Sequence, residues 1–353
     1  MNNKKRILVA PLNWGFGHAT RCIPIIDALL DDGFEPVLAS DGDALSMLKK
    51  EYPNLLQLEL PSYNISYSKK NKGLKWKLLK DSPNILKAIK QEKVEVDKII
   101  VKHNISGLIS DNRYGINSED IPSVFVTHQL RVLSGSTTWL SSKVQQRYLN
   151  AFDECWVPDF HGRSNLSGKM GHLKHDKPNI KYIGPISRLQ KSEVKNTYDL
   201  AVILSGPEPQ RSILEDILSM QLKNYKGKVL LVRGVLEDQQ KKVTSKQSTV
   251  VNFMLHEELE KAINGSDIIL ARSGYTTIMD LAKLGKKAFF IPTPGQFEQE
   301  YLAKNLKKRM IAPFSKQNEF EIKHLNEVHF YKGFVPNDDL QDLTELFDLF
   351  KGE

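Results

Sequence analysis

The sequence predicts an α/β protein of two domains, each built on a parallel sheet of the Rossmann type. The chain has 353 residues, which is more than one hydrophobic core usually organises. Strand-like and helix-like segments alternate along most of its length, a pattern typical of parallel sheets. The same opening of strand, glycine loop and helix occurs twice, near residue 12 and near residue 205.

The first half begins with this opening. Residues 6–12 form an apolar run, and the helical pattern that follows the glycine loop ends at Gly33. Later apolar runs predict further strands at 34–39, 107–110 and 123–127.

The second half begins after a polar, lysine-rich stretch that ends at Lys195. We therefore predict a domain at 1–190, a second at 196–330 and a helical tail at 331–353. Strands are expected at 199–204, 228–233, 250–253, 267–270 and 288–291. Helices are expected at 211–220, at 256–263, from the stretch 272–277 to near Gly285, and at 339–350.

Composition limits the partners and the compartment. The net charge of +8 and pI near 9.1 favour an anionic partner, such as a nucleotide diphosphate, nucleic acid or an anionic membrane. No nucleic-acid motif is present. Cys22 and Cys155 stand far apart without a Cys/His cluster, which favours a reducing compartment. With no signal peptide or spanning segment apparent, we expect a cytoplasmic protein whose membrane contact, if any, is peripheral.

The N-terminal glycine loop is a candidate reaction site. Gly15, Phe16 and Gly17 precede His18 between a strand and a helix, where backbone N–H groups can meet a phosphate or a polar substrate. His18 suits a general base because an imidazole has an unperturbed pKa of about 6.5. The alternative is a tight turn with a capping histidine.

Two other interpretations concern this half of the chain. A dinucleotide fingerprint would have glycine at Thr20, although Asp41 could serve as the ribose-binding acid. Asp41 and Asp43 also resemble a metal-binding pair, but a turn and helix cap is favoured. We therefore assign no metal site.

A denser polar cluster follows the predicted strands of the second half. Ser205 and Gly206, and then Arg272 to Thr277, stand at carboxyl ends of strands, where open α/β sheets bind ligands. A helix N-terminus, hydroxyls and a guanidinium there can bind a diphosphate. Asp280 could accept ribose hydroxyls or be a solvated helix charge. Gln296 and Gln299, in the expected loop after Ile291, could bind sugar hydroxyls or belong to a plain surface loop.

Three segments together resemble a known family. They are 15–18 (GFGH), 272–280 (RSGYTTIMD) and 292–299 (PTPGQFEQ). The chain resembles the GT-B glycosyltransferases of family 28, the family of MurG and the plant galactolipid synthases. The resemblance implies two Rossmann-like lobes that face each other across a cleft, with a UDP-sugar in the C-terminal lobe and the acceptor at the N-terminal glycine loop. It also implies inversion at the sugar, no metal and no cofactor beyond the UDP-sugar substrate.

Residue roles follow from the resemblance. His18 would be the base, with Asp111 as the alternative, and the acceptor would be a hydroxyl compound that could be lipid-linked. The acceptor-side residues would be Gly15, Phe16, Gly17, Asp111 and Arg113; the donor-side residues would be Ser205, Gly206, Phe253, Met254, Leu255, Arg272, Ser273, Gly274, Thr276, Thr277, Asp280, Gln296 and Gln299. Phe253 to Leu255 would line the base, and Gln296 and Gln299 would contact the sugar.

The sequence departs from the family at two positions. Asp280 stands where glutamate is usual, so the carboxylate reaches one methylene less far. Pro207 and Glu208 replace glycines in the first loop, where proline removes a donor and glutamate would repel a phosphate. Three alternatives stay open: a UDP-sugar hydrolase or epimerase of the same fold, an NAD-dependent oxidoreductase, and a non-catalytic protein that binds anionic surfaces.

The segment 68–80 predicts contact with anionic membranes. It carries six lysines and no acid, with Trp76 and leucines between them, although a solvated basic helix has the same composition. Each lysine near an anionic surface contributes about 1 kcal/mol. We expect the protein to sediment with anionic vesicles at low salt and a variant with glutamate at Lys72, Lys75, Lys77 and Lys80 to remain in solution. Equal sedimentation of both proteins would rule this segment out as the contact.

Overall fold

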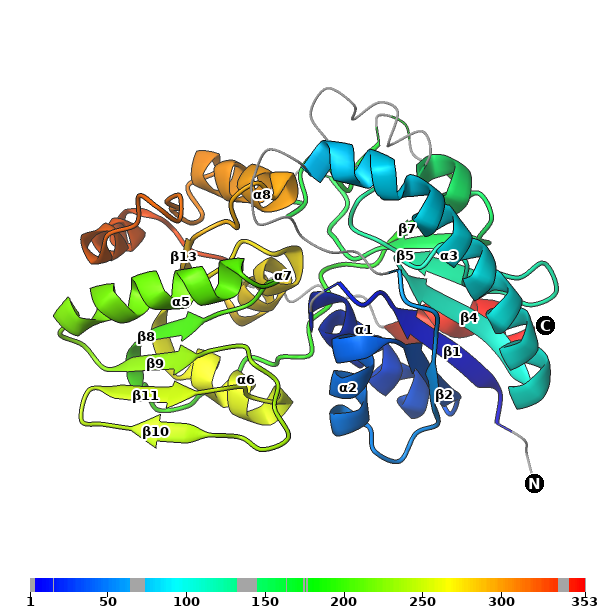
Figure 1. Ribbon diagram of the computed structural model, residues 1–353, viewed down its shortest axis with the longest axis horizontal. Helices are drawn as coiled ribbons and strands as arrows, with labels where there is room; N and C mark the ends of the chain where they lie inside the picture. The colour runs from blue at the N-terminus through cyan, green and yellow to red at the C-terminus, as the bar shows by residue number, and fades with distance from the viewer. Residues whose placement is uncertain are drawn as a thin grey trace. The chain divides into compact units, whose positions relative to one another are not determined.

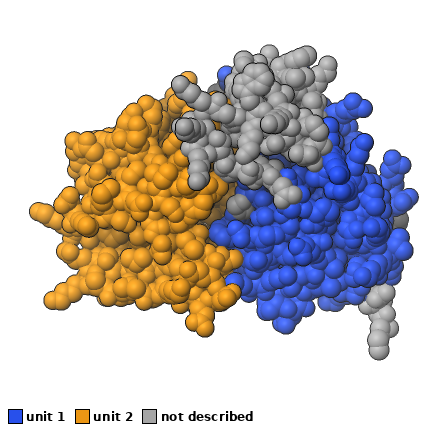
Figure 2. All heavy atoms as spheres, viewed as in Figure 1, with its two compact units in different colours: residues 1–186, 339–353 blue, residues 187–338 orange. Residues whose placement is uncertain are grey.

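The computed structural model describes two compact units. It covers residues 4–14, 16–63, 74–131, 145–162, 164–173, 175, 177–335 and 343–352, and side chains of the helix that begins at Leu74 are described from residue 86 on. Unit 1 comprises residues 1–186 and 339–353, and unit 2 comprises residues 187–338 (Figure 2). The chain therefore enters unit 2 at Ser187, before the polar stretch at which we expected the boundary.

Unit 1 is a seven-stranded parallel sheet with the strand order β3-β2-β1-β4-β5-β6-β7. Strands β1 to β4 alternate along the chain with helices α1, α2 and α3, which Figure 1 shows alongside the sheet. The elements are β1 (Arg6–Pro11), α1 (Phe16–Asp31), β2 (Glu35–Ser40), α2 (Gly42–Glu51), β3 (Gln57–Glu59), α3 (Leu74–His103), β4 (Ile105–Asp111), β5 (Ser123–Val126), β6 (Glu154–Val157) and β7 (Ile180–Tyr182).

The strand order of unit 1 reverses at β1. The chain adds β2 and β3 on one side of β1 and then returns to place β4 on the other side. In the register, Pro11 pairs with Asp111, so β1 and β4 reach the same sheet edge side by side. The loops that follow these strands leave in opposite directions, and such a point is where open α/β sheets bind ligands.

Unit 2 repeats this arrangement with six strands in the order β10-β11-β9-β8-β12-β13, of which only β10 runs antiparallel to its neighbour. The order reverses at β8, whose Ile203 pairs with Ala271 of β12. The elements are β8 (Tyr198–Ile203), α5 (Gln210–Gln221), η2 (Leu222–Asn224), β9 (Val229–Val232), β10 (Lys242–Thr244), β11 (Ser248–Val251), α6 (His256–Asn264), β12 (Ser266–Ala271), α7 (Tyr275–Leu284), β13 (Lys287–Phe290), α8 (Phe297–Lys308) and η3 (Ile322–Phe330).

The central strands are buried on both faces, as expected for sheets covered by helices. Residues Ile7 to Ala10 are fully buried, and so are Leu200 to Val202. This is why the strands appear in the sequence as continuous apolar runs rather than as an alternating pattern.

The end of the chain packs on unit 1 rather than forming a separate tail. The expected helix at 339–350 is a 3₁₀ turn, η4 (Leu343–Phe347), followed by a short helix, α9 (Asp348–Lys351). Phe350 lies edge-on to Phe34 and Trp156. It also fills the space beside Gly107, where a Cβ atom would come within 2.7 Å of two of its ring atoms. Apolar side chains near the C-terminus therefore complete the core of unit 1.

One local expectation was wrong. Residues 297–300 were expected in a loop, but they form the first turn of α8, which begins directly after Gln296. Across the described part of the chain, no helix combines the length and the apolar character needed to cross a membrane.

The aromatic contacts at the C-terminus predict a large stability effect. Phe350 is 2% exposed, so Phe350→Ala should lower the free energy of unfolding of unit 1 by about 3 kcal/mol or more through lost contacts and the cavity left behind. Val101→Ala is the control within unit 1, because Val101 is 81% exposed. Urea unfolding followed by tryptophan fluorescence measures both. Similar values for the two variants would contradict the packing described here.

Candidate active site

His18 lies at the strand-order reversal of unit 1. It is in the first turn of α1, and its Nδ1 is 3.0 Å from Oδ1 of Asp111, the last residue of β4. The His18 side chain is 15% exposed and that of Asp111 is fully buried. The buried carboxylate can orient the ring from its Nδ1 side, an arrangement that serves general bases.

Arg21 holds the same carboxylate and was not singled out from the sequence. One helical turn after His18, it donates from Nε to Asp111 Oδ2 at 2.5 Å and from Nη2 to Oδ1. Burial opposes ionisation of Asp111, but the charges of Arg21 and His18 outweigh it and hold the pKa of Asp111 well below its ordinary value. The carboxylate is therefore ionised and bound on both oxygens. This argues against its alternative role as the base, because a carboxylate with a lowered pKa and both oxygens bound has little tendency to take a proton.

Two further side chains complete this cluster. Arg21 Nη1 lies 2.8 Å from Nδ1 of His128, which follows β5, and Asn112 donates to Asp111 Oδ1 at 3.1 Å. His128 is 5% exposed. The only signal for Arg21 in the sequence was its spacing from His18, since residues three apart share a helix face.

Arg113 does not line the acceptor side as expected. Its side chain is fully buried, with Nε 2.5 Å from Glu92 Oε1 and Nη1 2.7 Å from Asp41 Oδ1. Burial alone would lower the pKa of Arg113, but Glu92 and Asp41 raise it. Asp41 is the residue that caps α2, as favoured, and its carboxylate is engaged in this ion pair. Arg113 therefore stabilises the loops after the strands rather than meeting a ligand.

The remaining acceptor-side residues lie at the start of α1. Phe16 and Gly17 are its first two residues, directly before His18, and Gly15 lies outside the described residues. The lysine-rich segment 68–80 also falls where no side chains are described.

The donor-side loops meet at the strand-order reversal of unit 2. Ser205 and Gly206 follow β8. Gly274 follows β12 and occupies the N-cap position of α7. Gly206 has φ +104°, a conformation that favours glycine. A Cβ atom at Gly206 or Gly274 would meet only one hydroxyl each, at 3.9 Å, so there is open space above both backbones. Half-buried Thr276 and Thr277 lie in the first turn of α7 beside this space.

Arg272 lies beneath this site rather than on its surface. It is 1% exposed, and its Nη groups donate to the carbonyl oxygens of Ile291, Pro292 and Gln210 and to Gln317 Oε1. Its Nε has no hydrogen-bond partner among the described residues. Burial, with no carboxylate to oppose it, lowers the pKa of Arg272. The guanidinium thus ties three loops together, while no described carboxylate is paired with its positive charge.

Ser273 and Gln299 also have internal partners. Ser273 Oγ donates to the carbonyl oxygen of Gln299 at 2.8 Å, and the Gln299 side chain accepts from the backbone N–H of Thr293 at 2.8 Å. These bonds hold the loop after β13 in shape. We had expected both side chains to contact a ligand directly, whereas the described contacts are internal to the protein. Gln296 caps α8. Thr293 was missed by the sequence reasoning: it is 2% exposed, its hydroxyl has no described partner, and it lies beside Gly206.

Asp280 lies one turn further along α7. Its Oδ1 accepts a hydrogen bond from Ser187 Oγ at 2.5 Å. Burial raises the pKa of Asp280 to about 6, against the smaller opposing effects of Ser187, Arg188 and His256. Asp280 is therefore not the solvated helix charge that the alternative interpretation required.

The expected base-lining residues form a half-buried loop. Phe253, Met254 and Leu255 connect β11 to α6. Asn252, 3% exposed, fixes the start of this loop by accepting from Lys241 N at 2.7 Å and Phe253 N at 3.1 Å. The apolar loop is thereby held in one conformation beside the carboxyl end of β11.

Glu208 does not act as a free negative charge at the first loop. Its Oε1 lies 2.6 Å from an Nη of Arg211 and 3.0 Å from Ser212 Oγ. The anticipated repulsion of a phosphate is therefore reduced by the neighbouring cation.

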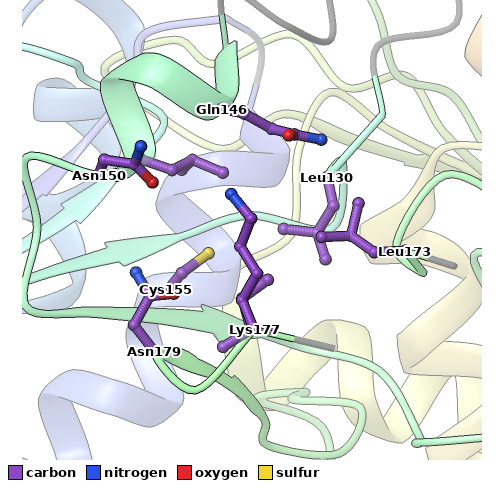
Figure 3. A pocket seen from close by; sticks show the side chains of 9 residues that line it. Leu130, Gln146, Asn150, Cys155, Leu173, Lys177 and Asn179 are labelled. Atoms are coloured by element: carbon purple, nitrogen blue, oxygen red, sulfur yellow. The ribbon is translucent and has the colours of Figure 1, made fainter. Parts of the chain in front are cut away.

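A separate small pocket in unit 1 contains none of these residues (Figure 3). It is lined mainly by apolar and amide side chains around a buried thiol: Leu130, Gln146, Leu149, Asn150, Cys155, Leu173, Lys177, Asn179 and Ile180. Burial raises the pKa of Cys155 to about 12, so the thiol stays protonated and unreactive. Within the described residues, no group of three or more His, Cys, Asp or Glu side chains is placed to hold a metal ion.

Comparison with known proteins finds similarity to glycosyltransferases, and a domain match falls in the second half of the chain. Residues 201–330 match the Glycosyltransferase family 28 C-terminal domain. Over 310 residues the chain is 22% identical to the UDP-N-acetylglucosamine--N-acetylmuramyl-(pentapeptide) pyrophosphoryl-undecaprenol N-acetylglucosamine transferase of Haemophilus ducreyi, covering 84% of this chain and 81% of that protein. The enzyme of the same name from Histophilus somni is 24% identical over 288 residues, covering 78% and 74%.

Solved structures show the same fold. Acinetobacter baumannii MurG superposes with a TM-score of 0.54 at 13% identity, covering 93% of this chain and 90% of that one. The spinosyn rhamnosyltransferase SpnG superposes with a TM-score of 0.62 at 14% identity, covering 98% and 96%. The two α/β units thus have the GT-B fold. In sequence the chain is similar to glycosyltransferases of family 28, whose C-terminal domain matches residues 201–330.

The raised pKa of Asp280 predicts a pH-dependent stability. The group binds a proton more tightly in the folded protein, where its pKa is about 6, than in the unfolded chain, where it is about 3.9. Stability should therefore fall as pH rises from about 4 to about 6 and then level off, by at most about 3 kcal/mol from this group. Asp280→Asn, which keeps an acceptor for Ser187, should remove this fall, as measured by urea unfolding across the pH range. His256→Gln is the control for titration of the neighbouring imidazole. Parallel curves for the parent and Asp280→Asn would contradict the assignment.

Proposed function

We propose that the protein transfers a hexose from a UDP-sugar to an acceptor hydroxyl, with inversion at the anomeric carbon and without a metal ion or other cofactor. One observation carries the proposal. In unit 2, the buried guanidinium of Arg272 has no carboxylate partner and lies beneath the N-terminus of α7, where the strand order reverses. A buried unpaired charge is costly unless a counter-ion reaches it.

A diphosphate has the charge and size that this site requires. The N-terminus of α7 attracts anions through its N–H groups and dipole. The hydroxyl of Thr293 is a further donor, and the open space over Gly206 and Gly274 admits phosphate oxygens close to the backbone. The same groups would stabilise the charge that develops on the diphosphate as it leaves the sugar.

His18 would be the base for the reaction. Asp111 on its Nδ1 side leaves Nε2 to receive the proton of the acceptor hydroxyl. The acceptor oxygen forms a bond to the anomeric carbon as the bond from that carbon to the phosphate oxygen breaks, and UDP leaves with the electron pair. A single displacement of this kind inverts the anomeric configuration.

The names of two relatives indicate a class of sugar donor and a class of acceptor. The Haemophilus ducreyi and Histophilus somni proteins are named as N-acetylglucosamine transferases that use UDP-N-acetylglucosamine and a pyrophosphoryl-undecaprenol acceptor. We accordingly propose a UDP-N-acetylhexosamine or related UDP-hexose as donor and a lipid-linked acceptor, with the protein at the cytoplasmic face of a membrane.

Binding and turnover should separate in variants of this site. UDP at about 100 times its dissociation constant should stabilise the parent by roughly 2.7 kcal/mol, seen as a raised melting temperature. His18→Ala should keep this shift but release UDP from the UDP-sugar at least about 100-fold more slowly in the presence of acceptor lipids. His329→Ala, at an exposed histidine of unit 2, is the control for both measurements.

The outcomes distinguish the alternatives. No shift with UDP, together with a shift for NADH, would replace the proposal by a nicotinamide-dependent reaction. Release of UDP at an unchanged rate without any acceptor would identify a UDP-sugar hydrolase instead. Full activity of His18→Ala would reject His18 as the base and leave the donor assignment intact.

A further inference from the structure

The Nδ1 atom of His18 has neighbours that demand opposite protonation states. Asp111 Oδ1 at 3.0 Å can only accept a hydrogen bond, whereas Arg21 Nη2 at 2.9 Å and, further away, Asn112 Nδ2 at 3.5 Å can only donate one. A ring nitrogen cannot do both at once. The position of the Arg21 guanidinium therefore decides which tautomer of His18 is present.

The two tautomers differ in chemistry. When Nδ1 carries the proton and donates to Asp111, Nε2 has a bare lone pair and can act as a base. When Nδ1 accepts from Arg21, Nε2 carries the proton and cannot take another without becoming charged beside a guanidinium. A base at His18 therefore requires that Arg21 stay directed at Asp111.

His128 restrains the far end of Arg21. Nη1 of Arg21 lies 2.8 Å from His128 Nδ1, and because a guanidinium N–H only donates, that nitrogen must be bare and accepting. Arg21 is 1% exposed, so its N–H groups compete for the few acceptors around them. With Nη1 engaged by His128, Nε and Nη2 remain on the Asp111 carboxylate. Without that acceptor, the guanidinium would turn towards the nearest remaining one, His18 Nδ1.

We propose that His128 is a positioning residue that acts through Arg21 to hold His18 in the tautomer with Nδ1–H bound to Asp111 and Nε2 bare. The inference rests on the proposed role of His18 as the base. It assigns complementary tautomers to the two histidines on either side of Arg21: His18 is protonated at Nδ1 and His128 at Nε2.

The first test needs no substitution in the measured protein. ¹⁵N spectra of the histidine-labelled parent near pH 8, above the ordinary imidazole pKa of about 6.5, distinguish protonated from bare ring nitrogens. Signals are assigned by their loss in His18→Gln and His128→Gln. We expect a bare Nε2 in His18 and a bare Nδ1 in His128. A protonated Nδ1 in His128, or a bare Nδ1 in His18, would overturn the proposal.

The second test replaces the acceptor. His128→Asn keeps an oxygen close to the position of Nδ1 and should retain the parent signals of His18. His128→Leu has no acceptor and should shift most of His18 to the tautomer with Nε2–H. The ring of His172, which stacks on Tyr182 at 4.7 Å, serves as the internal reference for intact folding. An unchanged His18 signal in His128→Leu, or the same change in both variants, would contradict the mechanism.

These measurements use the protein without nucleotide, so their result is separate from that of the donor assignment. Where the transfer assay is active, His128→Leu should lower kcat by about 10-fold or more with the UDP-induced shift unchanged, and His128→Asn should restore most of the loss. If His128→Leu fails to fold, the parent spectrum and His128→Asn still decide the question.

Discussion

The reversal of strand order in each parallel sheet is the constraint on which the rest of the molecule depends. A parallel sheet needs a crossover for each added strand, and when the chain changes direction of growth the loops after two neighbouring strands part. In unit 1 this occurs between β1 and β4, and in unit 2 between β8 and β12. His18 follows the first of these strands, Asp111 ends the second, and Gly206 and Gly274 follow the corresponding strands of unit 2. The topology of each sheet thus determines where the cluster lies, and the side chains determine its chemistry.

The two sites treat buried charge in opposite ways. In unit 1, the charges of Arg21 and Asp111 compensate each other inside the protein, so the pair can hold an imidazole in place without any ligand. In unit 2, Arg272 is equally buried, but its partners in the described part of the chain are carbonyl and amide oxygens. Neutral acceptors solvate its N–H groups and leave its net charge uncompensated. The charge-compensated pair and the uncompensated guanidinium thus lie in different units.

Several other buried polar side chains hold the loops that surround these two clusters. Arg113 joins Glu92 of α3 to Asp41 at the start of α2, and so fixes two segments that border the carboxyl edge of the first sheet. Asn252 and Gln299 do the same for the loops after β11 and β13. Such residues are buried and hydrogen-bonded to the backbone or to charged partners, which keeps a loop in one conformation while its other side is exposed to water.

The sequence by itself determined the class of fold, the order of most strands and helices, and the loops in which the reactive groups lie. Those features depend on local patterns: apolar runs, helical spacing and glycines at strand ends. Short edge strands such as β3, β7 and β10 were missed because three residues carry too little pattern. Tertiary structure alone decided how each charged side chain is used. Arg21, Arg113 and Arg272 look alike in the sequence, yet one orients a carboxylate, one stabilises loops and one lies unpaired beneath a strand-end site. Their partners are 90, 21 and 45 residues away in the chain, and burial and pairing at such separations arise only when the sheet brings the strand ends together.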